Sequence, residues 1–306
     1  MSSASELFFV LRYNRNMILK HFKQIILLAA GATSIAVTLS IILFVTAHAR
    51  ASQTEVIFLD VGQGDSVLIK TKYGQNILID GGRDNRVLDR LGRNLSFFDR
   101  KFDMVIATHP DSDHIAGLIP VLERYQVDLL LDTGVLHDSN VFEAMREVIQ
   151  QKQILVRFVE SEQRYEFGEG VILDVLFPNK SFVDKDIDDN NAASIIVKFS
   201  DKEIDYIFTG DAPKEVEDEL VNIHGIYLDS EVLKIGHHGS DTSSSDLFLS
   251  MVTPEVAIIQ VGKDNRYNHP SFRVLRRLQD RSIPVLRNDE MGDIRFVSDG
   301  EFVEMR

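Results

Sequence analysis

The chain has 306 residues, of which 44% are hydrophobic and 26% are charged, a composition that is typical of a globular protein and excludes a disordered or fibrous one. Its net charge of −14 argues against binding of nucleic acid or anionic lipid through a broad basic surface, although a local cationic groove is compatible with this charge. The absence of cysteine excludes disulfides, thiolate metal ligands and a cysteine nucleophile.

The amino-terminal part of the chain has the charge pattern of a membrane anchor. Residues 1–24 carry four basic side chains against one acidic one, and residues 25–47 carry no charge. A helix of that length crosses a hydrocarbon core of about 30 Å, and the positive-inside rule places residues 1–24 in the cytoplasm. We therefore predict a single-pass protein of the cell membrane whose remaining chain is extracytoplasmic. The alternative is a signal peptide, because Ala47-His48-Ala49 fits a cleavage site, and cleavage near Ala49 would give a secreted protein.

Short β-branched runs after residue 54 predict an antiparallel meander, because glycine-containing turn sequences separate them. Beyond the meander, apolar runs of strand length alternate with segments of helical spacing. The predicted strands are 55–61, 66–71, 75–80, 104–107, 129–132, 154–159, 171–177, 194–199, 204–208, 231–235, 256–261 and 284–287. The predicted helices are 87–94, 116–125, 140–151, 213–222, 247–252 and 271–280. No linker interrupts this pattern, so we interpret residues 54–306 as one domain built of two similar halves.

The strand predicted at 104–107 leads into a loop that carries two histidines and two aspartates within six positions. His109 and Asp111 are two residues apart and share a face in extended chain. Asp113 and His114 stand where the chain turns into a helix, so they can face a second point close by. Imidazoles and carboxylates are ligands that divalent cations take in proteins, and two such points fit a two-metal site. We predict metal binding here, against the alternative of a polar surface loop.

Two later strands also end in polar residues. Asp211 directly follows the strand 204–208 and precedes a helix, a position that equally suits a turn or an N-cap. The strand 231–235 is followed by His237 and His238. Adjacent residues point to opposite sides of an extended chain, so we expect one of these histidines to bind metal directly. The other is then available to contact substrate or to orient a ligand.

Several motifs, in order along residues 55–290, make the chain resemble the metallo-β-lactamase fold superfamily, and within it the extracytoplasmic hydrolase-like domain of ComEC-type competence proteins, which take up DNA. The motifs are LDVGQGDS at 59–66, LIDGG at 78–82, HPDSDH at 109–114, TGD at 209–211 and HHGS at 237–240. The segment NRYNHP at 265–270 is similar to the stretch that precedes the family's carboxy-terminal helix. The resemblance implies an α/β (α+β) fold, a four-layer αββα sandwich with a two-metal hydrolytic site at one edge of its sheets.

The resemblance also implies roles for individual residues. The second metal site would be completed by His237 or His238, of which we assign His237 to the metal, and Asp211 would bridge the two ions. Support of the ligand loops would come from Asp80 and Asn191. The implied metal ligands are His109, Asp111, Asp113, His114, Asp211 and His237, and the implied catalytic residues are Asp113, His238 and His269.

One departure from the family pattern concerns the choice of metal. Most hydrolases of the superfamily have a histidine where Asp111 stands and another on a middle loop, but the corresponding stretch here, 189–194, contains none. An oxygen-rich site tilts the preference from zinc toward manganese or magnesium. The expected cofactor is two divalent ions, zinc or manganese, with magnesium as a further candidate.

From these features we predict a membrane-anchored, extracytoplasmic, metal-dependent hydrolase in which two ions activate a water. A phosphodiester suits such a site because its charge lies where the cations are. The resemblance to the competence proteins implies nucleic acid as the leading substrate and DNA-uptake or other envelope proteins as the expected partners. One alternative is the hydrolysis of a small ester, lactone or β-lactam at the same centre. Another is a catalytically weak scaffold that binds DNA.

Overall fold

The computed structural model describes residues 28, 31, 33–41 and 53–306 of the chain. The predicted membrane anchor at 25–47 therefore lies largely outside the described residues, as does the segment 1–24. The described part of the anchor is helical, and the hydroxyls of Thr38 and Ser40 donate to the carbonyls of Ser34 and Ala36 one turn earlier. Among the described residues, no helix is long and apolar enough to cross a membrane. Residues 53–306 form one compact unit.

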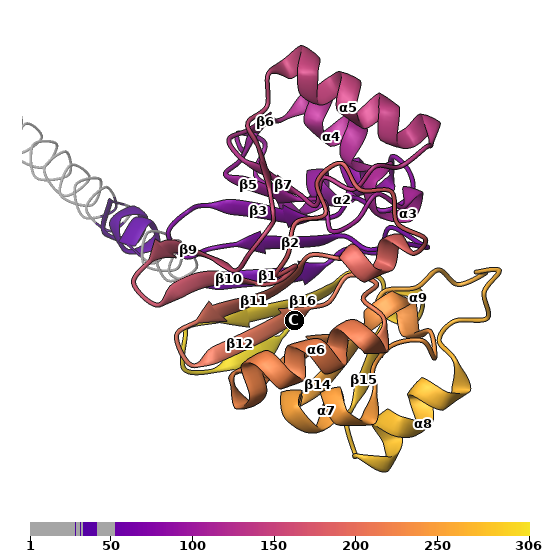
Figure 1. Ribbon diagram of the computed structural model, residues 1–306. Helices are drawn as coiled ribbons and strands as arrows, with labels where there is room; N and C mark the ends of the chain where they lie inside the picture. Colours follow the sequence, from indigo (N-terminus) through magenta and orange to yellow (C-terminus); the bar gives the residue numbers. More distant parts are fainter. Residues whose placement is uncertain (1–27, 29–30, 32, 42–52) are drawn as a thin grey trace, which may run out of the picture. The chain divides into compact units, whose positions relative to one another are not determined.

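The first sheet of this unit contains the predicted meander and extends on both sides of it (Figure 1). Its meander strands pair antiparallel, with Leu68 opposite Leu78, whereas the next strands along the chain join in parallel. In spatial order the strands are β17 (Val303–Met305), β16 (Ile294–Ser298), β1 (Thr54–Phe58), β2 (Val67–Lys70), β3 (Asn76–Ile79), β5 (Met104–Ile106), β7 (Leu130–Asp132) and β8 (Val156–Phe158).

The second sheet is antiparallel at one side and parallel at the other. Its order is β15 (Val285–Arg287), β14 (Val256–Ile259), β13 (Val232–Lys234), β12 (Ile204–Phe208), β11 (Ile196–Asp201), β10 (Val171–Phe177) and β9 (Gln163–Gly168). Two short strands, β4 (Lys101–Phe102) and β6 (Gln126–Val127), pair with each other apart from both sheets.

Helices cover the outer face of each sheet (Figure 1). The first sheet is covered by α2 (Arg86–Asn94), α3 (Ser112–Ile115), α4 (Leu118–Arg124) and α5 (Asn140–Lys152). The second is covered by α6 (Lys214–His224), α7 (Asp246–Val252) and α8 (Phe272–Asp280), and a short α9 (Asn288–Met291) follows β15. Three 3₁₀ turns, η1 (Asn190–Ala193), η2 (Gly225–Leu228) and η3 (Gly236–Gly239), lie in loops. The N-cap of α5 is Ser139, whose Oγ accepts the N–H of Phe142 at 3.2 Å.

Three buried apolar clusters show that the unit has four layers. One lies between the sheets, where Phe58 and Phe208 approach with ring centroids 5.8 Å apart. A second joins the outer face of the first sheet, including Ile57, to the helices above it, and a third does the same for the second sheet. Each buried aromatic or branched side chain contributes about 1.5–3 kcal/mol relative to exposure. The predicted αββα sandwich is thus confirmed.

The carboxy-terminal strands depart from the prediction of two similar halves. β16 crosses back to the first sheet and pairs antiparallel with β1, with Ile294 opposite Phe58, and β17 extends that edge. The sequence analysis predicted neither strand, nor β9, whose residues alternate between exposed and half-buried because it lies at the edge of its sheet. The last two strands of the chain therefore form the edge of the first sheet, next to β1.

Candidate metal centre

Five strand ends meet at one edge of the sandwich and supply a polar centre. β1, β3 and β5 run in the same direction in the first sheet, and β12 and β13 do so in the second. The loops that follow these strands carry the candidate ligands, which are Asp65, Asp80, residues 109–114, Asp211, His237 and His238. Because loops after parallel strands gather at one edge, residues far apart in the sequence come together here.

Asp80 fastens the loop that carries the sequence-predicted ligands. Its fully buried carboxylate accepts the N–H of Thr108 at 2.8 Å and the Thr108 hydroxyl at 2.7 Å. The same carboxylate accepts a hydrogen bond from Nδ1 of His114 at 2.7 Å. The ring of His114 is thereby held with its other nitrogen, Nε2, turned away from Asp80 and toward the centre.

Two more histidines are oriented in the same manner. Nδ1 of His238 lies 3.0 Å from the carbonyl of Gln260, which can only accept, and Nδ1 of His109 lies 2.9 Å from the Thr108 hydroxyl. In all three histidines Nε2 is buried and has no hydrogen-bond partner among the described residues. A buried polar atom without a partner is costly, so three of them at one point fit a site that binds a cation.

The distances between these nitrogens and nearby carboxylates fit a metal ion. Oδ2 of Asp211 lies 3.4 Å from Nε2 of His114 and 3.3 Å from Nε2 of His238. Oδ2 of Asp113 also lies 3.3 Å from Nε2 of His238. Two ligand atoms that bind one ion at about 2.1 Å with tetrahedral geometry are about 3.4 Å apart. The described residues contain four such groups of potential ligands, drawn from Asp65, Asp80, His109, Asp113, His114, Asp211 and His238.

Asp111 lies at the exposed side of the centre. Its side chain is 37% exposed, and its Oδ2 is 3.9 Å from Nε2 of His109. Asn190 on η1 donates from Nδ2 to Asp111 at 3.0 Å and also contacts His137. Asn191, the residue predicted to support this loop, instead has a buried side-chain oxygen without a partner. The middle loop thus reaches Asp111 through Asn190.

The two adjacent histidines of η3 differ in burial. Both have left-handed backbone conformations, with φ of 48° and 53°, and this turn places His238 inside while His237 stays 29% exposed on its side chain. Nε2 of His237 is 3.8 Å from Asp211, and Nδ1 contacts Thr242. His269 is half-buried with its ring centroid 5.8 Å from that of His237. The pair His237–His269 therefore lies beside the centre, toward solvent.

Asp65 and Lys234 belong to the centre although the sequence analysis did not assign them. Lys234, 2% exposed, forms an ion pair with Asp65, lies 3.5 Å from Oδ1 of Asp211, and donates to the carbonyl of Gly210 at 2.7 Å. Oδ1 of Asp65 is 3.2 Å from Nδ1 of His238. The centre thus contains a permanent ammonium group among its carboxylates.

Gly64 allows the loop of Asp65 to pack directly against the ligand loop. A Cβ at Gly64 would stand 2.0 Å from the carbonyl oxygen of Asp113, and the φ of Gly64 is +116°. Both features favour glycine strongly. The signal that could have found the two unassigned residues was therefore present: a tight glycine turn that ends in Asp65, and a lysine, Lys234, inside an apolar strand.

The carboxylates of the centre attract positive charge. Burial, together with the neighbouring charge of His114, lowers the pKa of His109 to about 4. Burial also lowers the pKa of His238, but the carboxylates of Asp211 and Asp65 outweigh it and raise that pKa to about 10. The region around His238 is therefore the strongly negative part of the centre, where a proton or a metal cation is stabilised.

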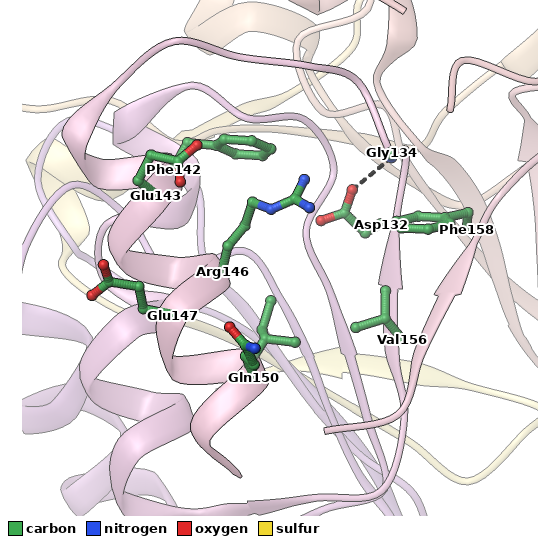
Figure 2. A pocket seen from close by; sticks show the side chains of 10 residues that line it. Asp132, Gly134, Phe142, Glu143, Arg146, Glu147, Gln150, Val156 and Phe158 are labelled. Carbon is green, nitrogen blue, oxygen red and sulfur yellow. Dashed lines mark hydrogen bonds between the residues drawn. The ribbon is translucent and has the colours of Figure 1, made fainter. Parts of the chain in front are cut away.

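A separate pocket of about 460 Å³ lies between α5 and the strands β7 and β8 (Figure 2). Arg146 extends from α5 toward Asp132, whose carboxylate accepts the N–H of Gly134 at 2.6 Å. Burial raises the pKa of Asp132 despite that bond and the nearby Arg146. Phe142 and Phe158 supply apolar walls. None of the centre's candidate ligands lines this pocket.

Comparison with known families and proteins agrees with the geometry. The profile of the metallo-beta-lactamase superfamily matches residues 59–263. The chain is 32% identical over 270 residues to the protein named ComE operon protein 3 of Bacillus subtilis, covering 80% of this chain and 33% of that protein. It is 31% identical over 246 residues to competence protein ComA of Neisseria gonorrhoeae, covering 80% of this chain and 32% of that protein. The chain thus spans about a third of the length of these relatives.

Among solved structures, the metallo-beta-lactamase fold protein YhfI of Bacillus subtilis superposes with a TM-score of 0.51 at 13% identity. The match covers 83% of this chain and 100% of that one. At this identity the likeness shows a shared fold.

Proposed function

This chain belongs to the metallo-beta-lactamase superfamily and has the fold of its metal-dependent hydrolases, and from this premise we propose that it is a phosphodiesterase that cleaves nucleic acid. The observation that carries the proposal is the convergence of three unpartnered imidazole Nε2 atoms with the carboxylates of Asp113 and Asp211 at one edge of the sheets. Carboxylate-rich pairs of metal sites suit phosphoryl oxygens, which carry the negative charge of the substrate.

Two ligand sets, sharing Asp211, would hold the two ions. We call Asp113, His114, His238 and Asp211 the inner set, and His109, Asp111 and Asp211 the outer set. The inner set includes His238 because its Nε2 is buried and lies 3.3 Å from both Asp113 and Asp211, whereas His237 is partly exposed. This assignment exchanges the roles that the sequence analysis gave to His237 and His238.

Bound ions would lower the pKa of a water and clamp the oxygens of the scissile phosphate. The protein's own residues would do the remaining work. Asp113 or Asp211 accepts the proton that the water loses as it attacks phosphorus. His237 and His269 lie on the exposed side, where they can donate hydrogen bonds to the leaving oxygen or to the non-bridging oxygens. Asp80 and the Gln260 carbonyl keep the ligand rings in place during these steps.

The location and partners of the enzyme are part of the same proposal. The uncharged stretch 25–47, preceded by basic residues, supports a single membrane anchor with the hydrolase unit outside the cytoplasm. The relative named competence protein ComA supports DNA as the substrate and DNA-uptake proteins as partners. Protease treatment of intact cells, followed by detection of the unit 53–306, tests this placement.

The activity is tested with the full chain in non-ionic detergent, stripped of metal and then supplied separately with Mn²⁺, Zn²⁺ or Mg²⁺. The substrates are bis(p-nitrophenyl) phosphate and a fluorescently labelled oligonucleotide. We expect metal-dependent cleavage of both, and a rate at least about 100-fold lower for Asp113→Asn, because that change removes a carboxylate from the inner set.

Asp128→Asn is the matched control, since Asp128 is a 41% exposed carboxylate that pairs with Lys101 away from the centre. It should cleave both substrates at the wild-type rate. Absence of phosphodiester cleavage with every metal contradicts the proposal, and hydrolysis of a lactone or β-lactam in its place identifies the small-substrate alternative.

A further inference from the structure

A second pocket, of about 430 Å³, has a charge opposite to that of the protein as a whole. We call it the cationic pocket, and its volume is in the range of ligand-binding pockets, about 300–1,000 Å³. Four cationic side chains and a single acidic one line it, in a chain whose net charge is −14. The cationic side chains are those of Arg83, Arg86, Lys263 and Arg266, and the acidic one is that of Asp264.

Most of these cations lack an acidic partner. Only Arg86 forms an ion pair with a described residue, Asp84 at 3.0 Å, whereas Arg83, Lys263 and Arg266 form none. All four are exposed, three of them in loops and Arg86 at the start of α2. Cations that are gathered around one hollow and outnumber the nearby counter-charges repel each other, and an anion in the hollow relieves that repulsion.

A buried polar group in the wall of the pocket also lacks a partner. Gln63 is 6% exposed, and its side-chain oxygen accepts the N–H of Gly262 at 3.3 Å. Its side-chain nitrogen, Nε2, is buried and has no hydrogen-bond partner among the described residues. An unpartnered amide donor in a cationic wall is a second, independent indication of an acceptor ligand such as a phosphate oxygen.

The pocket adjoins the candidate metal centre. Gln63 is two residues before Asp65, on the glycine turn that packs against Asp113. Among the other lining residues, Asn265 donates to the carbonyl of His269 at 2.8 Å, and the ring of Tyr267 stacks on that of His269. A chain of phosphates that enters the centre past His269 therefore passes this hollow.

We propose that the cationic pocket binds a backbone phosphate of the nucleic-acid strand next to the phosphodiester that is cleaved. Arg83, Lys263 and Arg266 supply the charge, and Nε2 of Gln63 donates a hydrogen bond to a phosphate oxygen. This inference rests on the proposed phosphodiesterase function, and it makes the enzyme selective for polynucleotides over small phosphodiesters. It also reconciles a nucleic-acid substrate with the acidic protein, because the binding charge is local.

The test compares Arg83→Ala/Arg266→Ala with the wild type, both as full chains. The probe is a fluorescein-labelled single-stranded DNA of about 12 nucleotides, and metal-free protein binds it in EDTA so that no cleavage occurs. We expect roughly tenfold weaker binding of the double variant, measured by fluorescence anisotropy. The slope of log affinity against log salt should fall by about 0.7, because one phosphate contact is lost. Cleavage of bis(p-nitrophenyl) phosphate with Mn²⁺ should stay unchanged.

Arg100→Ala/Arg276→Ala is the matched control, because it removes the same charge from exposed sites outside the pocket. It should bind the oligonucleotide like the wild type. Equal binding by the pocket variant and the wild type overturns the inference, as does an equal loss in both double variants or failure of the wild type to bind. A protein that binds DNA through the pocket but cleaves no phosphodiester retains the inference about the pocket and refutes the proposed activity.

Discussion

The inner and outer ligand sets differ in how firmly the fold holds them. In the inner set, the imidazoles of His114 and His238 are buried and each donates from Nδ1 to a fixed acceptor. The outer set depends on Asp111, which is 37% exposed and receives its hydrogen bond from Asn190 on a 3₁₀ turn. A ligand that is already fixed loses little conformational entropy when it binds an ion, whereas an exposed one must be ordered. We therefore expect the inner ion to bind more tightly than the outer ion.

The largest effect should come from His238→Ala, which removes an imidazole from the inner set. We expect loss of the tightly bound ion and a fall in activity of at least about 100-fold. Metal content by elemental analysis after dialysis, together with the rate on bis(p-nitrophenyl) phosphate, measures both. The matched change His237→Ala should keep the ion. Loss of the ion in His237→Ala alone would reverse the assignment of the two histidines.

Asp111→Ala should weaken one ion selectively. Removal of this carboxylate deprives the outer set of its only ligand outside the buried region, so the second ion should bind about 10–100-fold more weakly while the first is unchanged. Isothermal titration calorimetry of metal-free protein with Mn²⁺ resolves the binding of the two ions. A parallel loss at both steps would show that the two sets act as one.

Asp111→His should shift the metal preference of the outer set from manganese toward zinc. A second imidazole in the outer set favours zinc over manganese, because imidazole suits zinc and carboxylate suits harder cations. We expect the ratio of Zn²⁺ to Mn²⁺ affinity at the second site to rise about tenfold, measured by competition between the two metals. An unchanged ratio would mean that Asp111 does not bind the ion.

The smallest effect should come from Asn190→Ala. It removes one hydrogen bond to Asp111, worth about 1 kcal/mol, so the outer ion should bind about fivefold more weakly. The inner ion should be unaffected in the same calorimetric titration. A larger loss than that of Asp111→Ala would indicate that Asn190 itself is a ligand.

The fold and the polar loop that carries candidate ligands could be predicted from the sequence because both have local signals. The meander at β1–β3 and the polar run from His109 to His114 are contiguous, so spacing alone identifies them. β16 and β17 were not predicted, because β16 pairs with β1, which lies more than 200 residues earlier in the chain. No local sequence pattern indicates that pairing.

The rest of the centre depends on contacts between distant segments. Asn190 reaches Asp111 across 79 positions, and Lys234 pairs with Asp65 from another sheet. The membrane anchor predicted at 25–47 stays a prediction, since most of it lies outside the described residues.

The buried ammonium of Lys234 bears on the order in which the protein folds and acquires metal. Carboxylates that face one another without a cation repel, and a site made only of them would resist closing before an ion arrives. Lys234 holds Asp65 and Asp211 together from within the chain, so the two sheets can close on an empty centre. We therefore expect the metal-free chain to be folded, so that metal binding follows folding.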